Sequence, residues 1–243
     1  MVDVVKGQVQ RQSLRKIVKL FVCLAMKLHI SPSIAPGSVS GWECCIYISQ
    51  SFISTVMAKK DILNFNGLEI SNIVSKVNII FDDKQKFSSS SIPFITSKIF
   101  ASSCELLNSI LKHYPKQLYG CLPSYVGVIR SHFKHILQSE GRQSIQINEK
   151  TKQIVKLCEF LSPHKEVFKK HVVGLILDFM DALEIGMGAT LKVQFMPAIY
   201  SLIDMLSDYE IQQMNTMMNS TTKTLFRPFF QHYQKFHKYT GQF

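Results

Sequence analysis

Few side chains in this sequence have the types and spacing that chemistry requires. His132 and His135 lie one helical turn apart, so their imidazoles could share a metal ion. Asp178 and Asp181 have the same spacing, and paired carboxylates can perform acid–base work. A zinc site needs two further ligands, and the nearest cysteine, Cys121, lies far back along the same expected helix. We therefore expect partly exposed histidines and solvated carboxylates, with no metal site.

No catalytic signature stands out elsewhere. The sequence contains no P-loop, no G-x-G-x-x-G fingerprint and no H-E-x-x-H pair. Residues 37–41 resemble a nucleophile elbow, but Val39 stands where the serine must be. None of the six cysteines forms a C-x-x-C pair, a pattern typical of reduced core cysteines in an intracellular protein. We expect a protein that is not an enzyme, binds no cofactor and does not span a membrane.

Composition and charge indicate a globular protein with polyanionic partners. The chain has 243 residues, of which 46% are hydrophobic and 19% charged, enough for one large domain or two small ones. Its net charge is +11, which favours nucleic acid, an acidic protein or an acidic membrane surface without choosing among them. The excess is uneven: residues 1–40 hold six Lys and Arg against one acid, and residues 211–243 hold four against none.

The final stretch, 232–239, alternates aromatic and basic residues. Aromatic rings can stack on unpaired bases while lysines neutralise phosphates, so this stretch could contact RNA. Helical spacing divides its side chains between two faces. One face is expected in the core: Phe226, Phe229, Tyr233 and Phe236. The other is left for a partner: Lys235, His237, Lys238 and Tyr239.

Apolar residues recur at helical period along nearly the whole chain. A Pro/Gly/Ser loop follows the first helix, and an internal linker is expected at 82–91. Residues 70–80 are rich in β-branched residues, which leaves a strand possible there. Pro197 either kinks its helix or opens the helix's second part. The apolar stripes that mark the expected helices cover 14–28, 42–56, 70–80, 95–111, 118–137, 154–161, 167–183, 191–206, 211–218 and 225–236. The helix marked by 118–137 is expected to reach Gly141, and the helix marked by 211–218 is expected to begin at the Ser207 capping box.

The order of these helices predicts an all-α fold. The tight break at Pro115 makes its two flanking helices antiparallel neighbours, and Ser207 with Glu210 matches a capping box. No sequence repeat of fixed period is visible, yet helix follows helix with short breaks. That organisation favours antiparallel hairpins stacked as a HEAT- or armadillo-like α-solenoid. A compact all-α bundle is the alternative.

Four segments of the second half, taken in order, carry a family resemblance. They are LLNSILKHYPKQLYGCLPSYVGVIR, SPHKEVFKKHVVGLILDFMDAL, FMPAIYSLIDMLSDYEIQQMN and LFRPFFQHYQKFHKYTG. Together they resemble the C-terminal domain of the unhealthy ribosome biogenesis protein 2 family. The residues that match its pattern are Phe168, Lys169, Lys170, His171, Pro197, Tyr200, Asp204, Leu225, Phe226, Tyr233, His237, Lys238, Tyr239 and Gly241.

The likeness covers roughly Ser90 to the end and has departures. Ala198 stands where the family has glycine, and Tyr239 stands where it has tryptophan. Pro228 falls inside the last expected helix, which could kink or restart there. The resemblance divides the chain into a basic helical segment at 1–87, which shows no match, and a family domain at 90–243.

The resemblance implies a non-enzymatic nucleolar scaffold in early large-subunit assembly and pre-rRNA processing. It implies a location in the nucleus and nucleolus, and partners among the early assembly factors, including a DEAD-box RNA helicase. Pre-ribosomal RNA is a further partner, contacted directly or indirectly. Lys169, Lys170 and His171 join the tail residues as candidates for binding RNA or a partner. The alternative is a generic α-solenoid adaptor that acts outside the nucleolus.

Overall fold

A computed structural model of the chain describes residues 12, 13, 16, 19, 39–58, 64–82, 93–138 and 144–237. Every described element is helical and no strand occurs in these ranges, so the predicted all-α class is confirmed. The expected helix at 14–28 and the expected linker lie almost wholly outside the described residues. No helix in the described ranges is long and apolar enough to cross a membrane.

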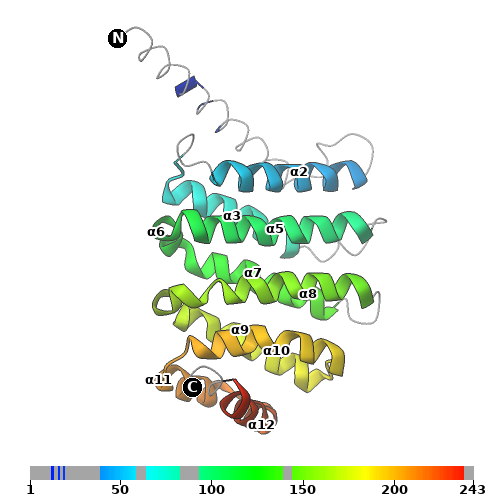
Figure 1. The fold of residues 1–243 in the computed structure, drawn as a ribbon, viewed down its shortest axis with the longest axis vertical. Helices are drawn as coiled ribbons and strands as arrows, with labels where there is room; N and C mark the ends of the chain where they lie inside the picture. Colours follow the sequence, from blue (N-terminus) through cyan, green and yellow to red (C-terminus); the bar gives the residue numbers. More distant parts are fainter. Residues whose placement is uncertain are drawn as a thin grey trace. The chain divides into compact units, whose positions relative to one another are not determined.

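The helices follow one another along the chain, and from α5 onward most of the breaks between them are short (Figure 1). The elements of the first half are α2 (Val39–Met57), α3 (Gly67–Asp82), α5 (Pro93–His113), α6 (Pro115–Leu118), the 3₁₀ turn η2 (Tyr119–Cys121) and α7 (Leu122–Gln138). Those of the second half are α8 (Ser144–Glu159), the 3₁₀ turn η3 (Ser162–His164), α9 (Lys165–Ile185), α10 (Ala189–Asp204), α11 (Asp208–Met217) and α12 (Ser220–Phe236). Two compact units are formed, residues 1–131 and 132–243, and their boundary falls within α7.

In the first unit, α2 and α5 lie side by side. The Ser102 hydroxyl donates to the Gln50 side-chain carbonyl at 2.6 Å, and the hydroxyls of Ser54 and Ser109 lie 2.7 Å apart. The later residue of α2, Ser54, pairs with the later residue of α5, Ser109, so the two helices run parallel. Two helices separated by a single intervening helix run parallel when each consecutive pair is antiparallel.

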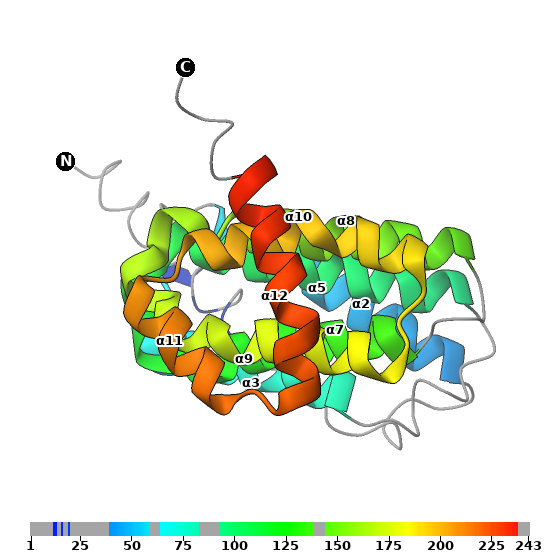
Figure 2. The ribbon, with the colours of Figure 1, turned by 90° about the horizontal axis from the view of Figure 1, so that it is seen from below.

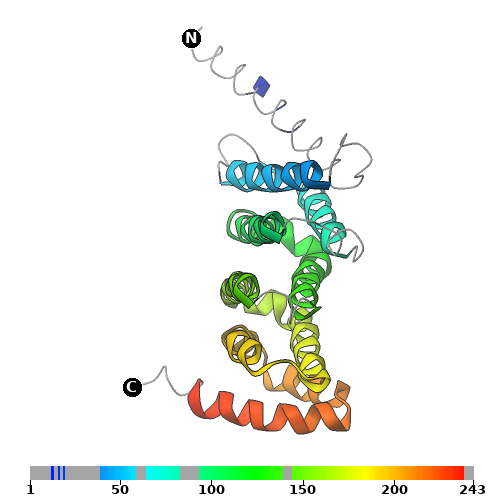
Figure 3. The ribbon, with the colours of Figure 1, turned by 90° about the vertical axis from the view of Figure 1, so that its right-hand side faces the viewer.

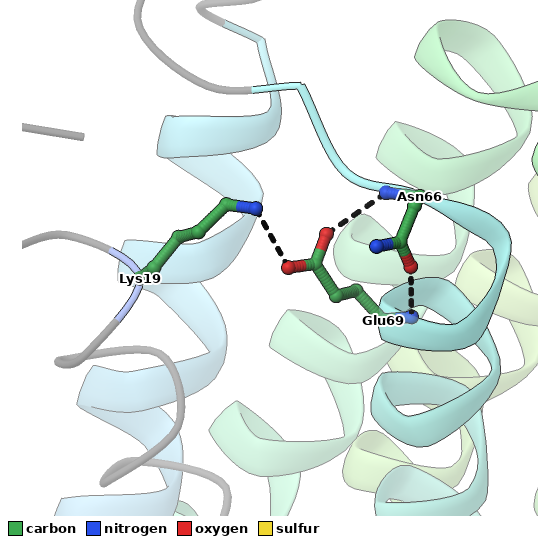
Figure 4. Close-up of polar contacts among 3 residues, drawn as sticks. All are labelled: Lys19, Asn66 and Glu69. Carbon is green, nitrogen blue, oxygen red and sulfur yellow. Dashed lines mark hydrogen bonds and ion pairs between the residues drawn. The ribbon is translucent and has the colours of Figure 1, made fainter. Parts of the chain in front are cut away.

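The start of α3 explains why residues 70–80 form a helix rather than a strand (Figure 4). The Glu69 amide donates to Asn66 Oδ1 at 2.9 Å, and the Asn66 amide donates to Glu69 Oε2 at 2.9 Å. This reciprocal arrangement satisfies two amides that a helix start leaves without partners. The other carboxylate oxygen of Glu69 accepts from Lys19 at 2.8 Å. The cap outweighs the β-branched residues that follow it.

The turn between α5 and α7 differs from the prediction of one helix over 118–137. The chain forms the short α6, then a 3₁₀ turn, and α7 begins only at Leu122. Pro123 has no amide hydrogen, so it fits the first turn of a helix but not a helix interior. Tyr125 donates to the carbonyl of Leu107 at 3.1 Å, so α5 and α7 are neighbours, as the break at Pro115 predicted.

In the second unit, α8 and α10 lie in one layer and α9 lies in the other (Figure 3). The start of α8 is ten residues earlier than the expected 154. The polar residues 148–153 hide the helical period there, although Lys150 and Thr151 are buried and Ile147 is packed in the core. The Thr151 hydroxyl donates to the Ile147 carbonyl at 2.8 Å, a bond internal to the helix that satisfies a buried polar side chain.

Local signals in the sequence set the ends of α9 and α11. Gly186 closes α9 with φ 107°, a left-handed conformation that glycine adopts without strain. Ser207 and Glu210 form the predicted capping box at the start of α11. The Ser207 amide donates to Glu210 Oε2 at 3.0 Å, and its hydroxyl donates to the same carboxylate. That hydroxyl bond is the main reason the pKa of Glu210 is lowered.

Helix α12 runs across α9 and α10 and completes the aromatic core of this unit (Figure 2). Phe179 of α9 lies 5.7 Å from Phe229 of α12 and 6.2 Å from Phe195 of α10, between ring centroids. Pro197 and Pro228 lie inside α10 and α12, and neither proline ends its helix. Both prolines are exposed, so the carbonyls that they leave without an amide partner can be solvated.

Candidate functional site

The end of α10 and the end of α12 bring together five polar and aromatic side chains. On α10 these are Tyr200 and Asp204, one helical turn apart. On α12 they are His232 and Tyr233, followed by His237, the residue that caps the end of α12. The Tyr200 hydroxyl lies 2.6 Å from His232 Nδ1. Tyr233 donates to Asp204 Oδ1 at 2.5 Å, and His237 Nε2 lies 2.7 Å from Asp204 Oδ2. We call these residues the α10–α12 cluster.

Ring contacts within the cluster add to its hydrogen bonds. Tyr200 lies 5.5 Å from Tyr233 and 5.2 Å from His237, between ring centroids. It also lies 5.2 Å from Phe229, so the cluster continues directly into the core. Aromatic pairs at such distances contribute about 0.5–1.5 kcal/mol beyond the area they bury. The cluster thus fixes where α12 lies on α10.

The electrostatics of the cluster suit attachment better than catalysis. Burial raises the pKa of Tyr233, and the bond to Asp204 and the charge of that carboxylate raise it further. Burial likewise raises the pKa of Tyr200. Both phenols therefore stay protonated and can donate at neutral pH. Each oxygen of Asp204 is already engaged by α12, so this carboxylate holds the helix rather than acting as a general base.

The predicted tail residues divide between this cluster and the surface. His237 contacts Asp204 and Tyr200 within the chain. A partner that bound His237 would therefore have to compete with these two contacts. Lys235 is exposed, and its ammonium lies 5.0 Å from the centre of the Phe236 ring. Lys238 and Tyr239 lie outside the described residues.

One expectation about the tail is wrong. Phe226, Phe229 and Tyr233 are buried as predicted, but Phe236 is 53% exposed. Phe236 is the last residue of α12, and it is the following residue, His237, that contacts Asp204 of α10. The Phe236 ring packs against His232 instead, with centroids 4.6 Å apart. An exposed aromatic pair therefore lies beside Lys235.

The second set of candidates lies on the first turns of α9. Lys169 pairs with Glu166 at 2.8 Å, and this pairing raises the pKa of the lysine and lowers that of the glutamate. Lys170 is exposed and His171 is half-buried. The role of both sets in binding remains a prediction.

The histidine pair of α7 is arranged differently from what its spacing suggested. His132 is fully buried rather than partly exposed, because the α7 face that carries it also carries the core residues Phe133 and Ile136. His135 Nε2 lies 3.2 Å from the ammonium of the buried Lys150. Burial, and then the charge of Lys150, lowers the pKa of His135 to about 4, and burial lowers the pKa of Lys150 to about 8. A neutral His135 that accepts from a cation is a poor ligand for a metal ion.

Only one of the two paired carboxylates of α9, Asp178 and Asp181, is solvated as expected. Asp181 is exposed, but Asp178 is buried, so the two do not form one solvated face. In the described ranges no group of three or more His, Cys, Asp or Glu side chains could hold a metal ion. Cys104, Cys121 and Cys158 are buried free cysteines, as expected of core thiols, whereas Cys44 is exposed.

Comparison with known protein families matches residues 49–242 to the Urb2/Npa2 family. The chain belongs to the Urb2/Npa2 family. Comparison with curated proteins and with solved structures finds no match. The match confirms the resemblance carried by the second half, and it begins some forty residues before Ser90, within α2.

Urb2/Npa2 proteins are ribosome biogenesis factors, which implies a role in ribosome biogenesis and a nuclear location for this chain. The α10–α12 cluster explains part of the family pattern in physical terms. Tyr200, Asp204, Tyr233 and His237 are all among the residues on which the resemblance is based, and they contact one another directly. Sequence spacing alone did not show that these two parts of the pattern meet.

Proposed function

We propose that this chain is a non-catalytic scaffold in early assembly of the large ribosomal subunit, acting in the nucleolus. The observation that carries the proposal is the family match over residues 49–242. The described residues add a series of helices whose bonded side chains serve packing, such as the Tyr200, Asp204 and Tyr233 contacts. A scaffold requires this kind of rigid helical surface.

The proposed architecture is a HEAT- or armadillo-like stack of helical hairpins. The parallel course of α2 and α5, and the layer formed by α8 and α10, support it within each unit. Stacked hairpins present long faces to partners. The proposed partners are other early assembly factors, including a DEAD-box RNA helicase, and pre-ribosomal RNA.

Depletion of the protein tests the proposal. Large-subunit pre-rRNA precursors should accumulate, and a tagged chain should concentrate in the nucleolus and sediment with pre-ribosomal particles. Unchanged precursor levels after depletion would contradict the proposed function. A tagged chain that is spread outside the nucleolus would favour a general helical adaptor instead.

A further inference from the structure

The outward side of α12 is a basic surface to which the helix itself contributes no acid. Helix α12 contains no Asp or Glu, and its three cations, Lys223, Arg227 and Lys235, are all exposed. Arg227 and Lys235 occur on the side opposite the buried Phe226, Phe229 and Tyr233, and Lys223 lies on the flank of that side. Within the described residues no salt bridge involves any of the three. Twelve residues separate the first from the last, which corresponds to about 18 Å along the helix.

An exposed aromatic pair lies at one end of this surface. Phe236 is 53% exposed, its ring contacts His232 at 4.6 Å, and Lys235 lies over it at 5.0 Å. His232 is held from below by the Tyr200 hydroxyl at 2.6 Å. The α10–α12 cluster thus fixes an aromatic edge that faces outward beside a cation.

We infer that this face of α12 binds single-stranded RNA. Lys223, Arg227 and Lys235 contact phosphates along one strand, and an unpaired base stacks on Phe236. A row of cations alone would fit any polyanion, but the exposed aromatic edge beside it favours a polyanion in which every repeating unit carries a flat ring, which an acidic peptide does not provide. Single-stranded RNA offers both phosphates and unpaired bases. The inference rests on the proposed function for the origin of the RNA, although the binding itself can be measured without it.

Binding of the whole chain to a fluorescent oligouridine tests the inference. In the variant Lys223→Glu/Arg227→Glu/Lys235→Glu, affinity should fall at least tenfold. In the neutral variant Lys223→Gln/Arg227→Gln/Lys235→Gln, the slope of log affinity against log salt should decrease by about 2, since each phosphate contact on a single strand contributes about 0.7. The matched control Lys112→Glu/Lys116→Glu/Lys156→Glu reverses three exposed lysines outside α12. It should bind like the wild type.

Stacking has its own test. Phe236→Ala should weaken binding about tenfold, within the range for loss of one stacked base, and should leave the salt slope unchanged. Phe160→Ala is the control, because Phe160 is 48% exposed on a different part of the unit. Circular dichroism melting of each variant verifies that the chain still folds. If the triple Glu variant fails to fold, the triple Gln variant and Phe236→Ala still test the inference.

Three outcomes would overturn the inference: no binding of oligouridine by the wild type, equal losses in the control variants, or competition by polyglutamate as effective as that by RNA. The last outcome would assign the surface to an acidic protein segment. These failures are separable from failure of the proposed function. If precursors accumulate on depletion while the wild-type chain binds no oligouridine, the scaffold role stands and the RNA surface does not.

Discussion

The phenol of Tyr233 donates a 2.5 Å hydrogen bond to the carboxylate of Asp204, joining α12 to the end of α10. His237, one turn further along α12, lies 2.7 Å from the other oxygen of the same carboxylate. One side chain thus determines the position of two. Asp204 is itself exposed, so its role in holding α12 comes from geometry rather than from burial.

Replacement of Asp204 should loosen α12. In Asp204→Ala the Tyr233 hydroxyl loses its acceptor and His237 loses its contact with the carboxylate. We therefore expect the free energy of unfolding to fall by about 1–3 kcal/mol. Urea denaturation measures the loss, and amide exchange should be fastest in α12. Asp181→Ala removes an exposed carboxylate of α9 and serves as the control. Equal protection of α12 in both variants would contradict this role.

The contact between His135 and Lys150 predicts a pH dependence of stability. Because the pKa of His135 is lowered to about 4, the unfolded chain binds more protons than the folded chain between pH 6.5 and 4. Stability therefore falls as the pH drops through this window. The contribution is as much as about 3 kcal/mol, at 1.36 kcal/mol per pKa unit.

His135→Gln provides the test. Its side-chain carbonyl can still accept from Lys150 but does not titrate, so the variant should lose less stability than the wild type between pH 6.5 and 4. Denaturation midpoints at several pH values measure the difference, and other titrating groups cancel in the comparison. Parallel curves for the two proteins would show that His135 does not titrate in this window.

The capping box of α11 should contribute measurably to the free energy of unfolding. Ser207→Ala removes the hydroxyl that bonds to Glu210, and we expect a loss of about 1 kcal/mol, typical of an N-cap replacement. Ser220→Ala, at the exposed first residue of α12, is the matched control and should change stability little. Thermal unfolding of the two variants compares them. A Ser207→Ala variant as stable as Ser220→Ala would refute this expectation.

Pro228 should lower the free energy of unfolding, because it removes a hydrogen bond from α12. Pro228→Ala restores an amide that can donate within the helix, and because Pro228 is exposed no packing is lost. We expect stability to rise by about 1–3 kcal/mol. A decrease in the denaturation midpoint would mean instead that the proline shapes the helix so that Tyr233 reaches Asp204.

The sequence predicted most helices because their apolar period is regular, as in α9, α10 and α12. It failed where polar residues interrupt that period: α8 begins early because Lys150 and Thr151 are buried despite their polarity. The capping box at Ser207 was readable because both partners are close in sequence. Asn66 and Glu69 carry the same signal at the start of α3, and it went unrecognised.

The candidate site was less predictable, because it depends on contacts between distant positions. Helical spacing correctly assigned Phe229 and Tyr233 to the core but placed Phe236 there too, since periodicity does not say which positions of a helix face the neighbouring helices cover. No sequence pattern announced that His237 would meet Asp204. The family resemblance contained both residues without indicating that they touch.

The late position of α12 in the chain has a consequence during synthesis. Phe229 covers Phe179 although 50 residues separate them, so the aromatic surface of α9 stays uncovered while the ribosome translates the intervening residues. A nascent chain in that state exposes apolar rings that chaperones bind and that other chains can adhere to. Translation pauses within this interval would prolong the exposure, so chaperones would bind the chain before α12 is in place.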